Sequence, residues 1–109
     1  MFGLSKPHPQ ISQVVILDQD FKIIKKITSE TMLAQFIKYW DSKKKLPANP
    51  EPPGQYKIDI FLGKPNLLKS HRYLYNEKKG TLRILTKTLT PEYQIEELDS
   101  FNELVLPAI

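Results

Sequence analysis

The sequence predicts a single small α+β domain. Its antiparallel sheet has about five strands, in the order strand, strand, helix, strand, strand, strand, with one main amphipathic helix on one face and a short C-terminal helix. Apolar residues alternate with polar ones in several short segments and recur at helical spacing in one longer segment, and short turns join the strands. The 109 residues suit one domain. Residues 1–10 show no periodicity, so we expect a flexible tail before a domain at 11–109.

The first two predicted strands form a hairpin. Residues 14–17 are a continuous apolar run rich in β-branched side chains, which is typical of a well-covered strand. Asp18 and Asp20 then indicate a turn, because an Asp side chain can accept hydrogen bonds from nearby backbone amides. The segment 21–27 follows as the second strand. Its apolar residues are expected on one face and its lysines on the other, namely Phe21, Ile23 and Ile27 against Lys22 and Lys26.

The main helix is predicted to begin at Thr28 or Ser29, whose hydroxyl can accept a hydrogen bond from an amide of the first turn. Its apolar residues share one face: Met32, Leu33, Phe36, Ile37 and Trp40. Three lysines at 43–45 lie where positive charge complements the C-terminal end of the helix. Pro47 and the prolines after it exclude a longer helix and predict a loop of about eight residues.

Three or four further strands are predicted after this loop, at 56–62, 71–75, 81–86 and, shorter, 93–95. The segment 76–80 between two of them ends in Gly80, which predicts a hairpin with that glycine in the left-handed region. Ser100 and Glu103 have the spacing of a capping box, which predicts a short closing helix.

Composition excludes several classes of chemistry. The absence of cysteine removes disulfides, thiolate nucleophiles, zinc fingers and iron–sulfur clusters. No signal peptide and no apolar run of about 20 residues is present, so we expect no membrane span and a cytoplasmic location. Residues 1–90 hold all 16 basic and 7 acidic side chains, whereas 91–109 hold five acidic ones and no basic ones. We expect this acidic end to fold back onto the basic body.

Neither a catalytic residue nor a cofactor is predicted. His8 lies in the expected tail, and Ser70 and His71, if both are in a strand, point to opposite faces. A small hydrolase that uses His71 stays a marginal third class. Asp18 and Asp20 lack the rest of a calcium-loop pattern, so no metal is predicted.

Protein or peptide recognition is the function class that remains. We expect a non-enzymatic interaction or regulatory domain whose partner is another protein or a second copy of this chain. A sheet covered mainly by one helix leaves a face or an edge strand available to a partner. Exposed aromatic side chains would anchor that partner, and the candidates are Tyr39, Tyr73 and Tyr75.

Nucleic-acid binding is the alternative, with a lysine-rich face as the site. The sequence pI is about 9.3, and aromatic residues lie beside cations on predicted strands, which suits base stacking and phosphate contacts. The candidate face consists of Lys22, Lys25, Lys26, Arg72 and Arg83. Against this reading, only two of the 16 cations are Arg, and the signatures of common nucleic-acid-binding folds are missing.

Overall fold

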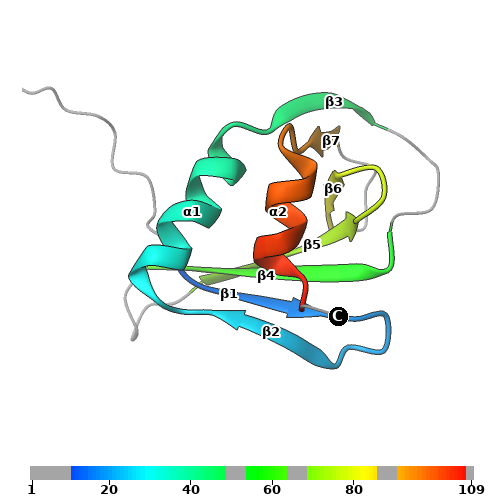
Figure 1. Cartoon of the computed structure of the whole chain (residues 1–109). Helices are drawn as coiled ribbons and strands as arrows, with labels where there is room; N and C mark the ends of the chain where they lie inside the picture. The colour runs from blue at the N-terminus through cyan, green and yellow to red at the C-terminus, as the bar shows by residue number, and fades with distance from the viewer. Residues whose placement is uncertain (1–10, 49–53, 64–68, 86–90, 108–109) are drawn as a thin grey trace, which may run out of the picture.

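The computed structural model describes residues 11–48, 54–63, 69–85 and 91–107. Within these residues it contains one antiparallel sheet of seven strands and two helices (Figure 1). The predicted α+β class with an antiparallel sheet is confirmed, although the sheet has more strands than the five or so that we expected. The predicted tail at 1–10 lies outside the described residues.

The elements alternate along the chain as two strands, a helix, five strands and a helix. Their bounds are β1 Ile11–Leu17, β2 Ile23–Ile27, α1 Glu30–Asp41, β3 Lys44–Ala48, β4 Tyr56–Leu62, β5 Lys69–Asn76, β6 Thr81–Ile84, β7 Pro91–Gln94 and α2 Leu98–Val105. Across the sheet the order is β2-β1-β4-β5-β6-β7-β3, so β2 and β3 form its two edges. Sequential neighbours pair in most of the sheet, and β4 inserts beside β1.

Both helices lie on one face of the sheet (Figure 1), which we call the helical face. Strand residues of alternate positions pack there with the helices to form the core. The core cluster includes Val14, Ile16, Ile27, Phe36, Trp40, Ile58, Ile60, Tyr75, Leu82, Phe101 and Val105. The residues between these positions point to the opposite side of the sheet, which we call the outer face.

Helix α1 begins and ends as its sequence predicts. Ser29 is the N-cap, and its Oγ accepts a hydrogen bond of 3.2 Å from the backbone amide of Met32. At the other end the Nζ of Lys43 donates to the carbonyl oxygen of Trp40 over 3.0 Å. Phe36 and Trp40 stack at 5.2 Å between ring centroids and are buried against the sheet. The helix is therefore held by its caps and by its aromatic face.

The loop expected from Pro47 onward is wrong at its start, because Lys44–Ala48 forms β3 and pairs with β7. Residues 49–53 of that loop lie outside the described residues. Proline is tolerated in β3 for two reasons: β3 is an edge strand, and the ladder shifts register at Pro47, so no ladder hydrogen bond is lost. The strand also brings the acidic end onto the basic body, since Lys44 and Glu96 form an ion pair of 3.0 Å.

Helix α2 confirms the predicted closing helix but not its predicted cap. The helix starts at Leu98 after Glu97, which makes no side-chain capping bond, so Ser100 lies inside the first turn. Burial explains the difference. Phe101 and Val105 are fully buried, and a helix beginning at Leu98 is long enough to carry both onto the sheet.

The hairpin between β5 and β6 forms as predicted. Gly80 has φ 71°, in the left-handed region that favours glycine. The side-chain oxygen of Asn76 accepts hydrogen bonds of 3.0 Å from the amides of Lys78 and Lys79, which closes the turn.

Trp40→Ala should lower the free energy of unfolding by about 3–5 kcal/mol, because the ring is buried between Phe36 and an edge-on contact with Tyr73. Urea denaturation followed by circular dichroism measures the change. Thr31→Ala, at an exposed position of the same helix, should change stability by less than about 0.5 kcal/mol. Equal midpoints for Trp40→Ala and the parent chain would show that this core assignment is wrong.

Candidate functional site

The turn between β1 and β2 is closed by the side chain of Asp18. Its Oδ1 accepts hydrogen bonds from the amides of Asp20, at 2.8 Å, and Lys22, at 3.0 Å. In the backbone, Phe21 N–H donates to Asp18 C=O and Asp18 N–H donates to Lys22 C=O. The predicted turn is confirmed, and these bonds hold it in a single geometry.

Phe21 occupies the position of this turn that glycine normally takes. The hydrogen bond from the Phe21 amide to the Asp18 carbonyl closes a four-residue turn over residues 18–21. In a hairpin of this kind the last of the four residues, here Phe21, adopts the left-handed region. Phe21 has φ 64° and is the only non-glycine residue with positive φ that the structure describes. For a side chain with a Cβ this conformation costs about 1–2 kcal/mol. Phe21 is nevertheless 56% exposed, so burial of its side chain offsets this cost only in part.

The prediction that Phe21, Ile23 and Ile27 fall on one face of the strand is wrong. Strand β2 begins at Ile23, and its pairing with β1 shifts register between Ile16 and Leu17. The shift breaks the alternation: Ile27 stays in the core, while Ile23 faces outward and is 54% exposed. A bulge of this kind inserts one residue and cannot be read from alternation alone.

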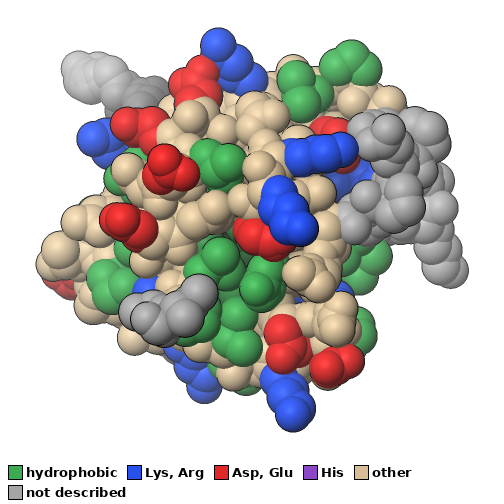
Figure 2. Space-filling view, turned by 45° about the vertical axis from the view of Figure 1, so that its right-hand side comes forward, with side chains coloured by type: hydrophobic (Ala, Val, Ile, Leu, Met, Phe, Trp, Pro, Cys, Tyr) green, Lys and Arg blue, Asp and Glu red, His purple; other side chains and the backbone are tan. Residues whose placement is uncertain are grey.

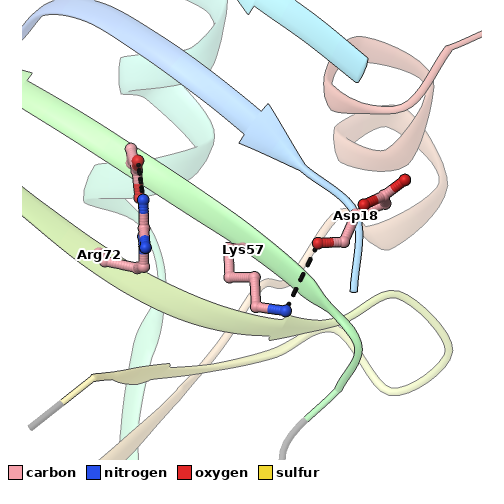
Figure 3. Close-up of polar contacts among 4 residues, drawn as sticks. Asp18, Lys57 and Arg72 are labelled. Atoms are coloured by element: carbon pink, nitrogen blue, oxygen red, sulfur yellow. Dashed lines mark hydrogen bonds and ion pairs between the residues drawn. The ribbon is translucent and has the colours of Figure 1, made fainter. Parts of the chain in front are cut away.

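Lys57 fixes the turn over the outer face. This β4 residue is only 9% exposed, and its Nζ donates to the carbonyl oxygen of Gln19 at 3.0 Å. It also donates to the carbonyl oxygen of Asp18 at 3.4 Å, as Figure 3 shows. The same Nζ lies 4.2 Å from the centroid of the Phe21 ring. A buried ammonium needs such partners, so the carbonyls and the ring together compensate for its lost hydration.

Arg72, on the neighbouring strand β5, lies beside Lys57 on the outer face (Figure 3). Its guanidinium binds Asp59 through two bonds, Nε to Oδ1 at 2.7 Å and Nη2 to Oδ2 at 2.8 Å. This hydrogen bonding to Asp59 raises the pKa of Arg72. The guanidinium carbon also lies 5.3 Å from the Phe21 ring. Two positioned cations therefore border one exposed aromatic ring.

The large apolar side chains that the described residues expose lie on the outer face with these cations. They are Phe21, Ile23 and Leu85. Leu85 follows β6, donates its amide to the carbonyl of Arg72 over 2.8 Å, and continues the alternation that puts Ile84 on the helical face. We call the set Phe21, Ile23, Lys57, Arg72 and Leu85 the outer patch. It combines apolar anchors with cations that are held in place, which is a composition suited to recognition.

The three tyrosines predicted to bind a partner lie on the helical face instead. Tyr75 is fully buried, and its hydroxyl donates to Oδ1 of Asn102 in α2. Burial, assisted by the nearby Glu77, raises the pKa of Tyr75. The structure therefore contradicts its role as an exposed anchor, because α2 covers that end of β5.

Tyr73 and Tyr39 are half-buried. The Tyr73 ring meets Trp40 edge-on at 4.9 Å, and burial raises its pKa. The Tyr39 ring lies edge-on to the Phe101 ring, with 6.2 Å between the ring centroids. Tyr39 also lines a shallow groove between α1 and α2. The groove lining also includes Lys25, Met32, Gln35, Lys38, Ser100, Glu103 and Leu104. Both rings thus serve the packing of helices and sheet, and Tyr39 also borders an accessible hollow.

The five cations of the predicted lysine-rich face do not form one surface. Alternation places Lys26, Arg72 and Arg83 on the outer face. Lys25 points to the other side and lines the groove between the helices, whereas Lys22 belongs to the turn. On the side of the molecule drawn in Figure 2, basic and acidic side chains are interspersed.

Sequence reasoning missed Phe21, Ile23, Lys57 and Leu85 as site residues. It placed the first two on one strand face with Ile27, because they alternate with lysine. One signal was available: an Asp that begins a short turn is followed three positions later by an aromatic residue where glycine is usual. Lys57 had no local signal, since its partners lie almost 40 residues away.

In comparisons with known proteins, no family model, curated protein or solved structure matches this chain. Within the described ranges no three His, Asp or Glu residues gather as a metal site would require. The described helices are all too short or too polar to cross a membrane. His71 is exposed on β5. The function is therefore inferred from the outer patch itself.

Lys57→Met should lower the free energy of unfolding by about 1–3 kcal/mol, because the carbonyl oxygen of Gln19 loses its donor while the volume of the side chain is kept. Thermal denaturation measures the loss. Lys69→Met, at an exposed site of β5, serves as the matched control and should be near neutral. If both variants unfold like the parent chain, Lys57 does not hold the turn.

Proposed function

We propose that this chain is a non-enzymatic protein-interaction domain that binds its partner through the outer patch. The observation that supports this most is Phe21, a half-exposed aromatic residue whose backbone has φ 64°. The turn that holds it there is closed by hydrogen bonds to the backbone and the side chain of Asp18. Strained backbone of this kind persists only where the surroundings determine it, and it is concentrated at functional positions.

Preorganisation is what makes the patch suited to binding. The turn is bonded through Asp18 and Lys57, so Phe21 loses little conformational freedom when a partner covers it. Ile23 and Leu85 extend the apolar surface on either side of the ring. Arg72 is already engaged by Asp59, which leaves part of the guanidinium at the surface, with its side chain 35% exposed. Aromatic and Arg residues of this kind dominate binding energy in protein interfaces.

A regulatory role within the cytoplasm remains part of this proposal. The patch contains no nucleophile paired with a base, and the contacts described around it join cations to carbonyls, to a carboxylate and to an aromatic ring. Such a surface recognises a partner and leaves its covalent bonds unchanged, which supports a binding module over an enzyme.

Phe21→Gly combined with Ile23→Ser should abolish partner capture while the domain stays folded, because glycine relieves the left-handed strain as the anchor is lost. The tagged chain is used as bait in lysate treated with nuclease, and captured proteins are identified by mass spectrometry. Affinity for the captured partner should fall by about 30-fold or more, as for loss of a central anchor.

The matched control for this experiment is Thr31→Ala combined with Ala34→Ser, at exposed positions on α1 away from the outer patch. The control should capture the same protein as the parent chain. Circular dichroism of all three proteins establishes that they are folded. Capture that is equal for the parent chain and the Phe21 variant would contradict the proposed site.

Nucleic-acid binding is the second candidate, and one observation favours it: an exposed ring, Phe21, lies beside the cations Lys57 and Arg72. The charges favour it less. Arg72 is bound to Asp59 and Lys57 to two carbonyls, so neither is available as a full phosphate ligand. Glu92 and Asp59 also lie on the outer face by strand alternation.

Binding to a fluorescent single-stranded oligonucleotide should therefore be weak and should disappear between about 50 and 200 mM salt. The complex with a captured protein should survive that change, because its anchors are mainly apolar. Fluorescence anisotropy at the two salt concentrations measures both. Tight, salt-resistant binding of the oligonucleotide that is lost in Phe21→Gly would favour the second candidate.

A further inference from the structure

Strand β2 is a terminal strand of the sheet. It pairs with β1 on one side, and among the residues that the structure describes no strand pairs with its other side (Figure 1). A terminal strand presents a row of amide and carbonyl groups that another chain can pair with. The outward edge of β2 is thus open to an added strand.

The opposite edge of the sheet is less suited to this. Strand β3 contains Pro47, which has no amide hydrogen, and its ladder with β7 shifts register at that residue. Such irregularities are the devices by which proteins protect an edge. The ladder of β2 with β1 also shifts register, between Ile16 and Leu17. β2 has no proline, however, so each of its residues Ile23–Ile27 carries both a donor and an acceptor.

The open edge is strongly basic. Lys22, Lys25 and Lys26 lie within six residues, and the segment 21–27 contains no acidic side chain. Upstream of this segment, the carboxylate of Asp18 is occupied by the turn, since it accepts hydrogen bonds from the backbone amides of Asp20 and Lys22. A strand that pairs with β2 would therefore place its side chains beside cations on both faces of the sheet.

The edge is continuous with the apolar part of the outer patch. Ile23 belongs to β2 itself, and Phe21 lies at the start of the same segment. Because side chains alternate between the two faces of a strand, an added strand has every second residue on the outer face, beside Ile23.

From this juxtaposition of an open edge, three lysines and the exposed side chain of Ile23, we propose that β2 binds an extended acidic segment of another protein, in which Asp or Glu alternates with apolar residues. This inference rests on the proposed function and specifies the partner. Charge complementarity favours this occupant over a second copy of the chain, because two β2 strands would bring four lysines together, Lys25 and Lys26 of each copy, with no carboxylate between them.

A short synthetic peptide of alternating Glu and Val tests the proposal directly. It is titrated into the isotope-labelled full chain, and backbone amide shifts are recorded by NMR. The largest shifts are expected at Ile23–Ile27, with smaller ones at Phe21. A peptide of alternating Lys and Val is the probe control and should produce no saturable shifts.

Charge reversal supplies the matched variants. Lys25→Glu combined with Lys26→Glu should weaken binding of the Glu–Val peptide by about tenfold or more, since two attractive cross-strand contacts become repulsive. Lys45→Glu combined with Lys69→Glu changes the net charge equally at exposed sites on β3 and β5, and should leave the affinity unchanged. Equal weakening in both pairs would overturn the proposal, because it would show only a response to net charge.

Three other results would overturn the acidic-strand proposal. These are no saturable binding of the Glu–Val peptide, peptide shifts confined to residues outside β2, and a dimer of the parent chain in sedimentation that Lys25→Glu with Lys26→Glu stabilises. An oligonucleotide that produces the β2 shifts in place of the peptide would do the same. The proposed function is tested separately from the acidic-strand proposal. If capture of a partner depends on Phe21 but not on Lys25 and Lys26, the proposed interaction domain is supported and only the acidic-strand proposal is overturned.

Discussion

The burial of β1 on both of its faces is the constraint on which the rest of this structure depends. Val14 and Ile16 point to the helical face and are completely buried, while Val15 and Leu17, on the outer face, are only 5% and 6% exposed. Four consecutive apolar residues cannot be covered by a single layer of helices. The outer face of the sheet must therefore supply cover of its own around β1.

That cover explains the unusual chemistry of the outer face. Across the ladder, Leu17 is flanked by Ile23 and Lys57, and Val15 by residues of the same two strands. Long side chains such as Lys can cover apolar surface with their methylene stems while the charged end reaches polar groups. Here the end of Lys57 reaches the carbonyls of the turn, so covering β1 and fixing the turn are one arrangement.

The same arrangement leaves Phe21 and Ile23 at the surface. The turn is closed by Asp18 and held from below by Lys57, so the chain passes through a left-handed residue before β2 begins. A glycine would adopt this conformation without strain, and the aromatic side chain found there is retained at a cost of stability. Stability and surface chemistry thus conflict at one residue, which supports the proposed binding role of Phe21.

The helical face has no such conflict. Phe36, Trp40, Tyr75 and Phe101 form a chain of ring contacts between 5 and 6 Å that joins both helices to β5. Aromatic pairs at these separations add to the energy of burial. The tyrosines that the sequence suggests as binding residues are used there for packing, so the proposed binding site lies on the other side of the sheet.

The sequence by itself determined the local elements of this protein: the buried run of β1, the Asp18 turn, the Ser29 cap and aromatic face of α1, and the left-handed Gly80. Each depends on neighbours within a few residues, so periodicity and capping chemistry suffice to predict it. Only the tertiary structure decided that Lys44–Ala48 pairs with β7, that Tyr75 lies under α2, that Phe21 and Ile23 face outward, and that Lys57 holds the turn. These features depend on a bulge, on an edge position or on partners distant in the sequence, and burial decides them once the strands have assembled.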